Sequence, residues 1–363
     1  MHPYIRADLI VIHFHLLEIW GKSPLGGLPP FFCSTVVLRT GDIITFVRSS
    51  LFPGFFLKEW FLGKVLLKFR FCTLFFAVGL ICFIDLSNAN ELGSKGNPLR
   101  MMFVPSGDSQ VILKGGEEIA QRLKKATGLH FRTSVATNYA AVIEAMGAEK
   151  VDIGWLAAFS YVLAREKHGV ELALIVIRFG SPFYRGQIMA GVNTGINNLA
   201  DFKDKTFAFV DPASTSGHLY PKSLLVSKGF DPKVFFNRAV FVGSHNAVLL
   251  SILKGEVDGG ASYDDARAAV AKNFPEVFKK VKIVSYTQNI PNDVVAVRKN
   301  LNPALKQRIK EGLKYLAKTP EGSKLLKQVY GISGLADLDA FYDPVREAGK
   351  LLGLDLGHKE TMD

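Results

Sequence analysis

Short apolar segments of strand length alternate with segments of helical spacing from Leu99 onward, and this alternation limits the possible folds more than any other feature. In Ser109–Ala126, for example, the apolar residues recur on one helical face. Strands separated by helices are typical of parallel sheets with helices on both faces. The first half is therefore predicted to be an α/β unit. Its expected strands are 99–105, 130–136, 150–155 and 171–179, and its expected helices are 109–126, 139–146 and 158–167.

A second alternating set begins near Asn193, and its last strand leads into three helical stretches at the C-terminal end. Two such units with short connections predict two lobes with a cleft between them. Ligands of open α/β sheets bind beyond the carboxyl ends of the strands, so we expect the site at the turns that end such strands. The expected strands are 206–211, 239–243, 257–262, 281–286 and 293–298, and the expected helices are 216–228, 246–254 and 263–273.

A secretory signal peptide is predicted at residues 65–89. Three basic residues between positions 64 and 70 precede Phe71–Ile84, an uncharged and mostly apolar run of 14 residues. Ser87-Asn88-Ala89 then places small residues where a signal peptidase cleaves. The apolar run is short for a membrane span, which needs about 20 residues. We therefore expect export to the periplasm.

Residues 1–64 precede the predicted signal peptide, although signal peptides normally begin a protein. We hypothesise that these residues are an upstream extension outside the natural product, with translation starting near Val65. The alternative is a true N-terminal extension with an internal membrane anchor. Cys33, Cys72 and Cys82 all precede the cleavage site, so the exported part would contain no thiol, which suits an oxidising compartment.

The formal net charge of the chain is +11. Residues 1–89 contain 8 basic and 5 acidic residues, which leaves 44 − 8 = 36 basic and 33 − 5 = 28 acidic residues, or +8, for the remainder. These basic residues are scattered, whereas a nucleic-acid surface is clustered, so we expect no nucleic-acid partner. A mildly basic surface favours approach of an anion. The histidines after residue 90 show no paired metal-ligand spacing, and we expect no metal and no cofactor.

One turn carries the chemistry. After the strand at 206–210 the sequence reads D-P-A-S-T-S-G-H-L-Y-P (Asp211–Pro221), with Ser214, Thr215 and Ser216 at the expected start of a helix. The unpaired N–H groups of a helix N-terminus favour an anion, and hydroxyl side chains add donors of similar reach. A single hydroxyl here would be explained by ordinary helix capping. Three hydroxyls followed by a glycine indicate a site for a tetrahedral oxyanion.

The pattern D-P-x-S-T-S-G-x-x-x-P resembles the anion-binding turn of the phosphate/phosphite/phosphonate substrate-binding proteins of ABC transporters. Further motifs agree in order and spacing, and the resemblance covers the chain from Asn97 to the last helix but not residues 1–64. These motifs are N-Y-A-A-V-I-E-A-M (Asn138–Met146), V-D-I-G-W (Val151–Trp155), G-S-P-F-Y (Gly180–Tyr184), G-S-H-N-A (Gly243–Ala247), G-E-V-D-G (Gly255–Gly259) and I-P-N-D (Ile290–Asp293).

The resemblance implies a bilobal, type II periplasmic-binding-protein fold, in which two α/β lobes joined by two crossing strands close over a ligand. Lobe 1 would comprise 97–187 and 297–363, and lobe 2 would comprise 192–293. The crossing strands would be G-Q-I-M-A-G-V and D-V-V-A-V-R. The ligand would be a phosphorus oxyanion (a phosphonate, phosphite or phosphate), and a monomer would deliver it to an ABC transporter permease in the inner membrane.

The resemblance also assigns roles to individual side chains. The three hydroxyls of the turn would hold the phosphorus oxygens, Tyr139 would donate its phenol from the opposite lobe, and His245 would donate an imidazole N–H. Leu156 departs from the family pattern, since some members have an aromatic hydroxyl there, and this argues against a 2-aminoethyl arm on the ligand. Acidic residues meet the amine of aminoalkyl phosphonates in some members, and the candidates here are Asp264, Asp265 and Asp293.

Simpler interpretations stay open at this point. Tyr139 fits a core position, His245 fits a helix cap, and Asp264 and Asp265 fit a solvated helix start. The same fold also binds sulfonate, sulfate or a thiamine precursor. A hydrolase with a serine of the turn as nucleophile and His245 as base would need an orienting acid that the sequence does not reveal. A binding protein that also reports to a signalling receptor is a further alternative.

Overall fold

The computed structural model describes residues 34–40, 43–49, 91–264, 266–337 and 342–356. The chain divides into two compact units, Met1–Phe83 and Ile84–Asp363. In the first unit, β1 (Ser34–Thr40) and β2 (Ile43–Ser49) pair in antiparallel fashion. The predicted signal peptide lies outside the described residues.

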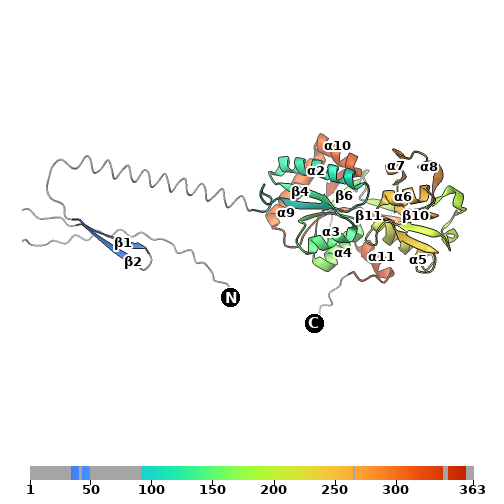
Figure 1. Cartoon of the computed structure of the whole chain (residues 1–363), viewed down its shortest axis with the longest axis horizontal. Coiled ribbons are helices and arrows are strands. Elements are labelled where there is room, and N and C mark those ends of the chain that lie inside the picture. Colours follow the sequence, from blue (N-terminus) through green and yellow to red (C-terminus); the bar gives the residue numbers. More distant parts are fainter. Residues whose placement is uncertain (1–33, 41–42, 50–90, 265, 338–341, 357–363) are drawn as a thin grey trace, which may run out of the picture. The chain divides into compact units, whose positions relative to one another are not determined.

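The second unit contains two α/β lobes, and Figure 1 shows each as a sheet flanked by helices. The sheet of lobe 1 has six strands in the order β13-β6-β12-β5-β3-β4. Strand β3 pairs in parallel with β4 and β5, whereas β12 runs antiparallel to β5 and β6. The strands are β3 (Leu99–Phe103), β4 (Phe131–Val135), β5 (Ile153–Leu156), β6 (Glu171–Arg178), β12 (Val294–Val297) and β13 (Ile332–Ala336).

Helices cover both faces of this sheet. Helix α2 shows how the local sequence sets the bounds: the Asp108 carboxylate accepts hydrogen bonds from the first N–H groups, and Gly128, at φ 72°, ends the helix in the left-handed conformation. Helices α2, α9 and α10 share one apolar core, and α3 and α4 lie on the other face. The helices are α2 (Ser109–Thr127), α3 (Tyr139–Gly147), α4 (Ala158–His168), α9 (Pro303–Lys318), α10 (Pro320–Tyr330) and α11 (Asp343–Leu351).

The sheet of lobe 2 has five strands in the order β11-β7-β10-β8-β9. A cluster of phenylalanines packs on one face, and α6 packs on the other. The strands are β7 (Phe183–Gly191), β8 (Thr206–Phe209), β9 (Arg238–Phe241), β10 (Gly259–Tyr263) and β11 (Val281–Pro291). The helical segments are η1 (Val192–Thr194), η2 (Leu199–Phe202), η3 (Thr215–Leu219), α5 (Tyr220–Ser227), α6 (His245–Leu253), α7 (Ala266–Ala271) and α8 (Val277–Lys280).

The structure corrects three details of the sequence interpretation. The sheets are mixed rather than parallel, because β7 and β12 enter each sheet from the other lobe and run against their neighbours. The chain leaves the first sheet after Arg178 and returns to it at Val294, so the expected boundary at 187 falls inside β7 and the one at 297 falls at the end of β12. The expected helix 216–228 is divided into a π-helix and α5.

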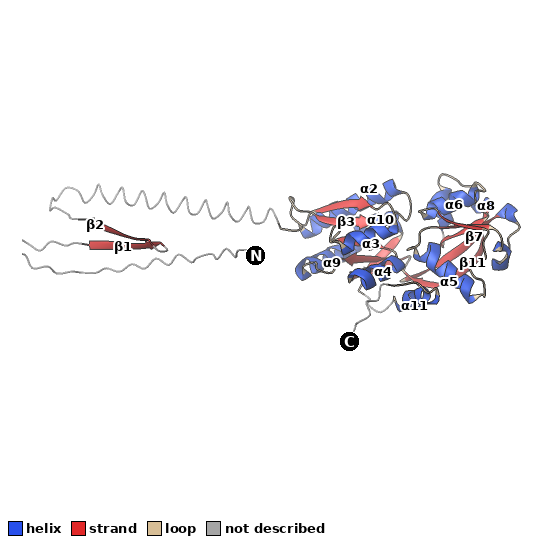
Figure 2. Ribbon diagram, turned by 60° about the horizontal axis from the view of Figure 1, so that its bottom comes forward, coloured by secondary structure: helices blue, strands red, loops and turns tan. Residues whose placement is uncertain are grey.

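The two lobes share one continuous apolar core, and the C-terminal helix α11 contacts α4 of lobe 1 and α5 of lobe 2. Figure 2, turned from the first view, again shows α11 near α5 at the junction of the lobes. Tyr342, just before α11, donates a hydrogen bond of 2.9 Å from its hydroxyl to the carbonyl of Asn292 in the returning crossing segment. The last helix therefore stabilises the contact between the lobes.

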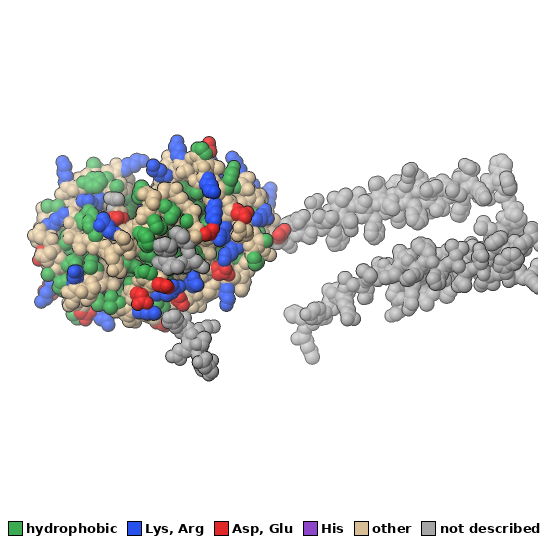
Figure 3. All heavy atoms as spheres, turned by 180° about the vertical axis from the view of Figure 1, so that it is seen from behind, with side chains coloured by type: hydrophobic (Ala, Val, Ile, Leu, Met, Phe, Trp, Pro, Cys, Tyr) green, Lys and Arg blue, Asp and Glu red, His purple; other side chains and the backbone are tan. Residues whose placement is uncertain are grey.

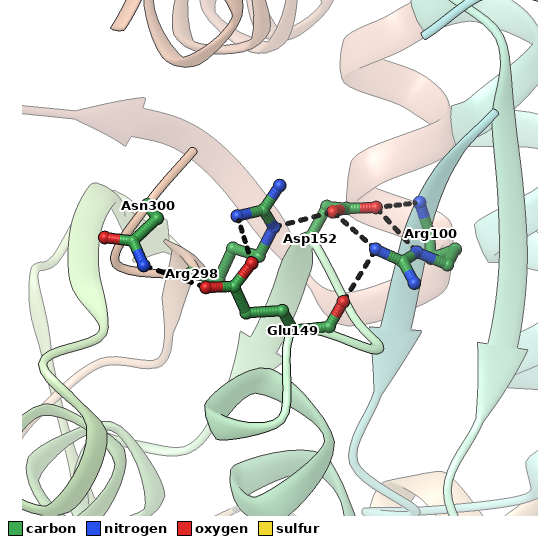
Figure 4. Close-up of polar contacts among 5 residues, drawn as sticks. All are labelled: Arg100, Glu149, Asp152, Arg298 and Asn300. Carbon is green, nitrogen blue, oxygen red and sulfur yellow. Dashed lines mark hydrogen bonds and ion pairs between the residues drawn. The ribbon is translucent and has the colours of Figure 1, made fainter. Parts of the chain in front are cut away.

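A charged network anchors the returning strand in lobe 1 (Figure 4). The fully buried carboxylate of Asp152 accepts hydrogen bonds from the side chains of Arg100 (2.9 Å) and Arg298 (2.8 Å). Glu149 and Asn300 extend the network at the surface. Burial acts to raise the pKa of Asp152, but the hydrogen bonds from the two arginines leave it below its ordinary value.

The surface is mixed in charge. Figure 3 shows basic side chains dispersed among acidic and apolar ones over one face of the molecule. Within the described residues, no helix combines the length and hydropathy needed to span a membrane.

Candidate functional site

The hydroxyl-rich turn forms as the first part of a π-helix. Ser214 is the N-cap, and its hydroxyl accepts a hydrogen bond of 3.2 Å from the N–H of Gly217. Pro221 has no N–H to donate to the carbonyl of Gly217 four residues earlier. That carbonyl instead accepts a hydrogen bond of 3.1 Å from the N–H of Val210 at the end of β8. Proline thus prevents a regular α-helix here, and the wider π-turn results.

Glycine is required at position 217. A Cβ atom there would lie 2.3 Å from Cγ2 of Val210 and 2.9 Å from the hydroxyl of Ser214. The turn can therefore fold back against β8 only if residue 217 has no side chain. This close packing buries Ser214, Thr215 and Ser216, whose exposed fractions are 2% or less.

Lobe 1 covers the turn with the first residues of two helices. The N–H of Phe159 in α4 donates a hydrogen bond of 2.8 Å to the hydroxyl of Thr215, and the hydroxyl of Ser160 donates one of 2.9 Å to the carbonyl of Ala213. At the start of α3, the N–H of Tyr139 donates one of 3.3 Å to the carboxylate of Asp211. Both helices are thus tied to lobe 2, and the lobes are in contact around the turn.

Two phenols face the hydroxyls. Tyr139 lies beside Ser214, and Tyr184 of β7 lies beside Ser216. Burial, followed by the negative charge of Asp293, raises the pKa of both phenols far above the ordinary value, and the adjacent serine hydroxyls offset only part of this. Both phenols therefore stay protonated at neutral pH and are available as hydrogen-bond donors.

His245 begins α6, and its N–H donates a hydrogen bond of 3.0 Å to the carbonyl of Ser106 in lobe 1. Nδ1 of its ring lies 2.8 Å from the hydroxyl of Ser262, and the ring packs edge-on against Tyr263. Burial, followed by the charge of Arg178, lowers the pKa of His245 to about 3. The imidazole is therefore neutral, and when Nδ1 accepts the proton of Ser262, Nε2 carries the N–H that donates.

Arg178 and Asp293 line a small cavity of about 30 Å³ at the carboxyl ends of strands in lobe 1. Arg178 is the last residue of β6, and Asp293 directly precedes β12. Burial raises the pKa of Asp293 to about 6, although the charge of Arg178 acts to lower it. Asp293 as a whole residue is half-buried. Trp155 and Leu156 form part of the cavity wall.

The structure brings together most of the predicted site residues: the three hydroxyls of the turn, Tyr139, His245 and Asp293. The carboxylate of Asp264 lies 3.8 Å from Nε of Arg185. Asp265 lies outside the described residues. The sequence interpretation did not name Tyr184, although it belongs to the quoted G-S-P-F-Y motif. It also missed Arg178, for which the only signal was a charge at the end of an apolar strand.

The hydrogen-bond donors around the turn are neutral hydroxyls, phenols and an imidazole, and most of them are buried. Such a set can hold an anion through several hydrogen bonds in a site of low dielectric. No group of three metal-ligating side chains occurs among the described residues. Nδ1 of His245 has the hydroxyl of Ser262, not a carboxylate, as its hydrogen-bond partner. Two lobes that enclose such donors define the class of ligand-binding proteins that close over a small solute.

Residues 101–340 match the family described as "ABC transporter, phosphonate, periplasmic substrate-binding protein". The phosphonates-binding periplasmic protein of Escherichia coli (strain K12) is 30% identical over 232 residues, which are 62% of this chain and 68% of that relative. The phosphate-import protein PhnD of Mycolicibacterium smegmatis is 32% identical over 172 residues, which are 44% of this chain and 53% of that relative.

Among solved structures, PhnD1 from Prochlorococcus marinus (MIT 9301) in complex with methylphosphonate is similar at a TM-score of 0.64 and 20% identity. The match covers 70% of this chain and 98% of the PhnD1 chain. This likeness supports the bilobal type II fold. The chain belongs to the periplasmic substrate-binding proteins of phosphonate ABC transporters. The family consists of binding components of transporters, so the prediction that the chain is not an enzyme is confirmed.

Proposed function

We propose that this protein binds a phosphorus oxyanion between its lobes, with Ser214, Ser216, Tyr139, Tyr184 and His245 as donors. The observation that carries this proposal is the convergence of these neutral donors on one buried turn in a member of the family. Neutral donors suit reversible capture, because they stabilise the anion without forming a permanent ion pair. Asp264, Asp265 and Asp293 stay candidates for contacts to an amine on the ligand.

The bound anion is released to an ABC transporter permease in the inner membrane. Export through the cleavable signal peptide at residues 65–89 brings the protein to the periplasm as a monomer. N-terminal sequencing of the exported protein tests this step, and a first residue far from Asn90 would refute it. Size-exclusion chromatography with light scattering tests the monomer.

The phosphorus compound is identified by calorimetric titration of the purified protein with phosphate, phosphite, methylphosphonate, 2-aminoethylphosphonate and sulfate. Charge-assisted hydrogen bonds contribute about 1.5–3 kcal/mol each, and association costs several kcal/mol. Dissociation constants of about 1 μM to 1 nM are expected for the preferred phosphorus compound. Preferential binding of sulfate, or of a sulfonate in a matched titration, would favour the alternative of a sulfur oxyanion.

A further inference from the structure

Arg178 brings a positive charge to the edge of the candidate site. Its guanidinium carbon lies 5.3 Å from the ring centroid of Tyr263 in lobe 2, and its charge acts on His245, Tyr184 and Asp293. Its Nε atom is buried and has no hydrogen-bond partner among the described residues. A buried guanidinium N–H without a hydrogen-bond partner lowers the stability of the folded protein. We therefore expect a ligand group to accept a hydrogen bond from this N–H.

The cavity that Arg178 lines is suited to a small substituent. Its volume of about 30 Å³ is two to three times the roughly 10–15 Å³ that a cavity needs to hold one water molecule. Space of this size accepts a group of a few heavy atoms, such as a methyl or a carboxylate. Arg178, in the wall of this cavity, also acts electrostatically on His245 and Tyr184 of the candidate site, which relates the cavity to those donors.

The charges that face the cavity favour an anionic substituent. Arg178 contributes a guanidinium cation to the cavity wall. Asp293, on the same cavity, opposes an anion while it is ionised, but burial raises its pKa to about 6, so it can take up a proton when an anion binds beside it. His245 is neutral. A guanidinium presents paired N–H groups that match the two oxygens of a carboxylate.

We propose that Arg178 makes the protein select phosphonates whose short substituent carries a carboxylate, with the guanidinium on the carboxylate and the hydroxyl turn on the phosphonate. This selection rests on the proposed function. Leu156, at the cavity wall, offers no hydroxyl for an amine, which is consistent with this choice. The probe compounds are phosphonoacetate, methylphosphonate and 2-aminoethylphosphonate.

Calorimetric titration of the purified protein at pH 7 tests the proposal. Phosphonoacetate is expected to bind at least about 10-fold more tightly than methylphosphonate, as one charge-assisted contact implies. Arg178→Gln is expected to abolish this preference, with a larger loss of affinity for phosphonoacetate than for methylphosphonate. Asp293→Asn is expected to strengthen phosphonoacetate binding. Arg132→Gln, at an exposed position on β4, is the control for the change in net charge and is expected to leave all three affinities unchanged.

Two outcomes overturn the proposal. One is tighter binding of 2-aminoethylphosphonate or methylphosphonate than of phosphonoacetate by the unmodified protein. The other is an equal loss for all three compounds in Arg178→Gln, with circular dichroism confirming that this variant is folded. Failure of the proposed function is distinguishable, because in that case the unmodified protein binds neither the three phosphonates nor phosphate or phosphite.

Discussion

Replacing Thr215 by valine tests whether the hydroxyl turn holds the lobes together. Thr215 is fully buried, and its hydroxyl accepts the N–H of Phe159 across the lobe boundary at 2.8 Å. Valine has nearly the same shape but no acceptor. In the Thr215→Val variant, the N–H of Phe159 would therefore be unsatisfied whenever the lobes are closed. When the lobes are open, water can satisfy it.

The size of the effect follows from this difference between the two states. An unsatisfied buried neutral donor costs about 1–3 kcal/mol, and here the cost falls on the closed state alone. Because the ligand binds in the closed state, the apparent affinity falls by the same free energy. Dissociation constants are therefore expected to rise about 5- to 150-fold. The free energy of unfolding of the ligand-free protein should change less.

Calorimetry gives the dissociation constant of the variant, and small-angle scattering at saturating ligand shows whether the lobes still close. Thr215→Ser is the matched control, since it keeps the oxygen and should bind within a few-fold of the unmodified protein. Equal affinities for Thr215→Val and the unmodified protein would refute the reasoning. An equal loss in both variants would show instead that the methyl group of Thr215 is what matters.

Three further variants test the remaining physical arguments. Tyr139→Phe keeps the packing but removes a donor to the anion, so calorimetry should show about 10- to 100-fold weaker binding with little change in the melting temperature; unchanged affinity would remove Tyr139 from the site. Asp293→Asn should raise the free energy of unfolding of the ligand-free protein, measured in urea, by up to about 3 kcal/mol at pH 7.5 but hardly at pH 4. The reason is that the raised pKa of Asp293 makes the unmodified protein lose stability as pH rises through about 6. A lower free energy of unfolding for the variant at pH 7.5 would contradict this. Asp152→Asn should cost about 3 kcal/mol at pH 7, because two arginines lose their buried carboxylate. Since the pKa of Asp152 is lowered, the stability that its carboxylate contributes is present above its ordinary pKa near 4 and is lost as pH falls below that value. A stability difference between Asp152→Asn and the unmodified protein that persisted undiminished at pH 2 would oppose this role of Asp152.

The sequence predicted most strands and helices because apolar periodicity is a local property. For example, α2 was expected at 109–126 and spans Ser109–Thr127. Strand direction leaves no such trace, so the antiparallel placement of β7 and β12 was missed. Strand β13 was also missed. It is a short five-residue strand at the edge of the sheet, and it follows directly on the C-cap glycine of α10.

The candidate site was predictable only in part, for a related reason. Ser214, Thr215 and Ser216 are adjacent in sequence and form a motif, and Tyr139 and His245 were named through the family resemblance. Arg178 belongs to no such motif. Its proposed role in binding a substituent depends on β6 ending beside Asp293, which lies 115 positions later in the chain (293 − 178 = 115). Relations of this kind depend on tertiary packing, which periodicity does not encode.

The three hydroxyls look equivalent in sequence but have different surroundings. Ser214 and Ser216 face phenols, whereas Thr215 accepts a backbone N–H from the other lobe. In the proposed site, closure and ligand binding therefore use neighbouring atoms of one turn, and closing the lobes would complete the set of donors around the anion. Substitution of Thr215 should then weaken all ligands by the same factor, because closure is common to them. Substitution of Arg178 should change the order of preference among ligands, because only the substituent meets that side chain.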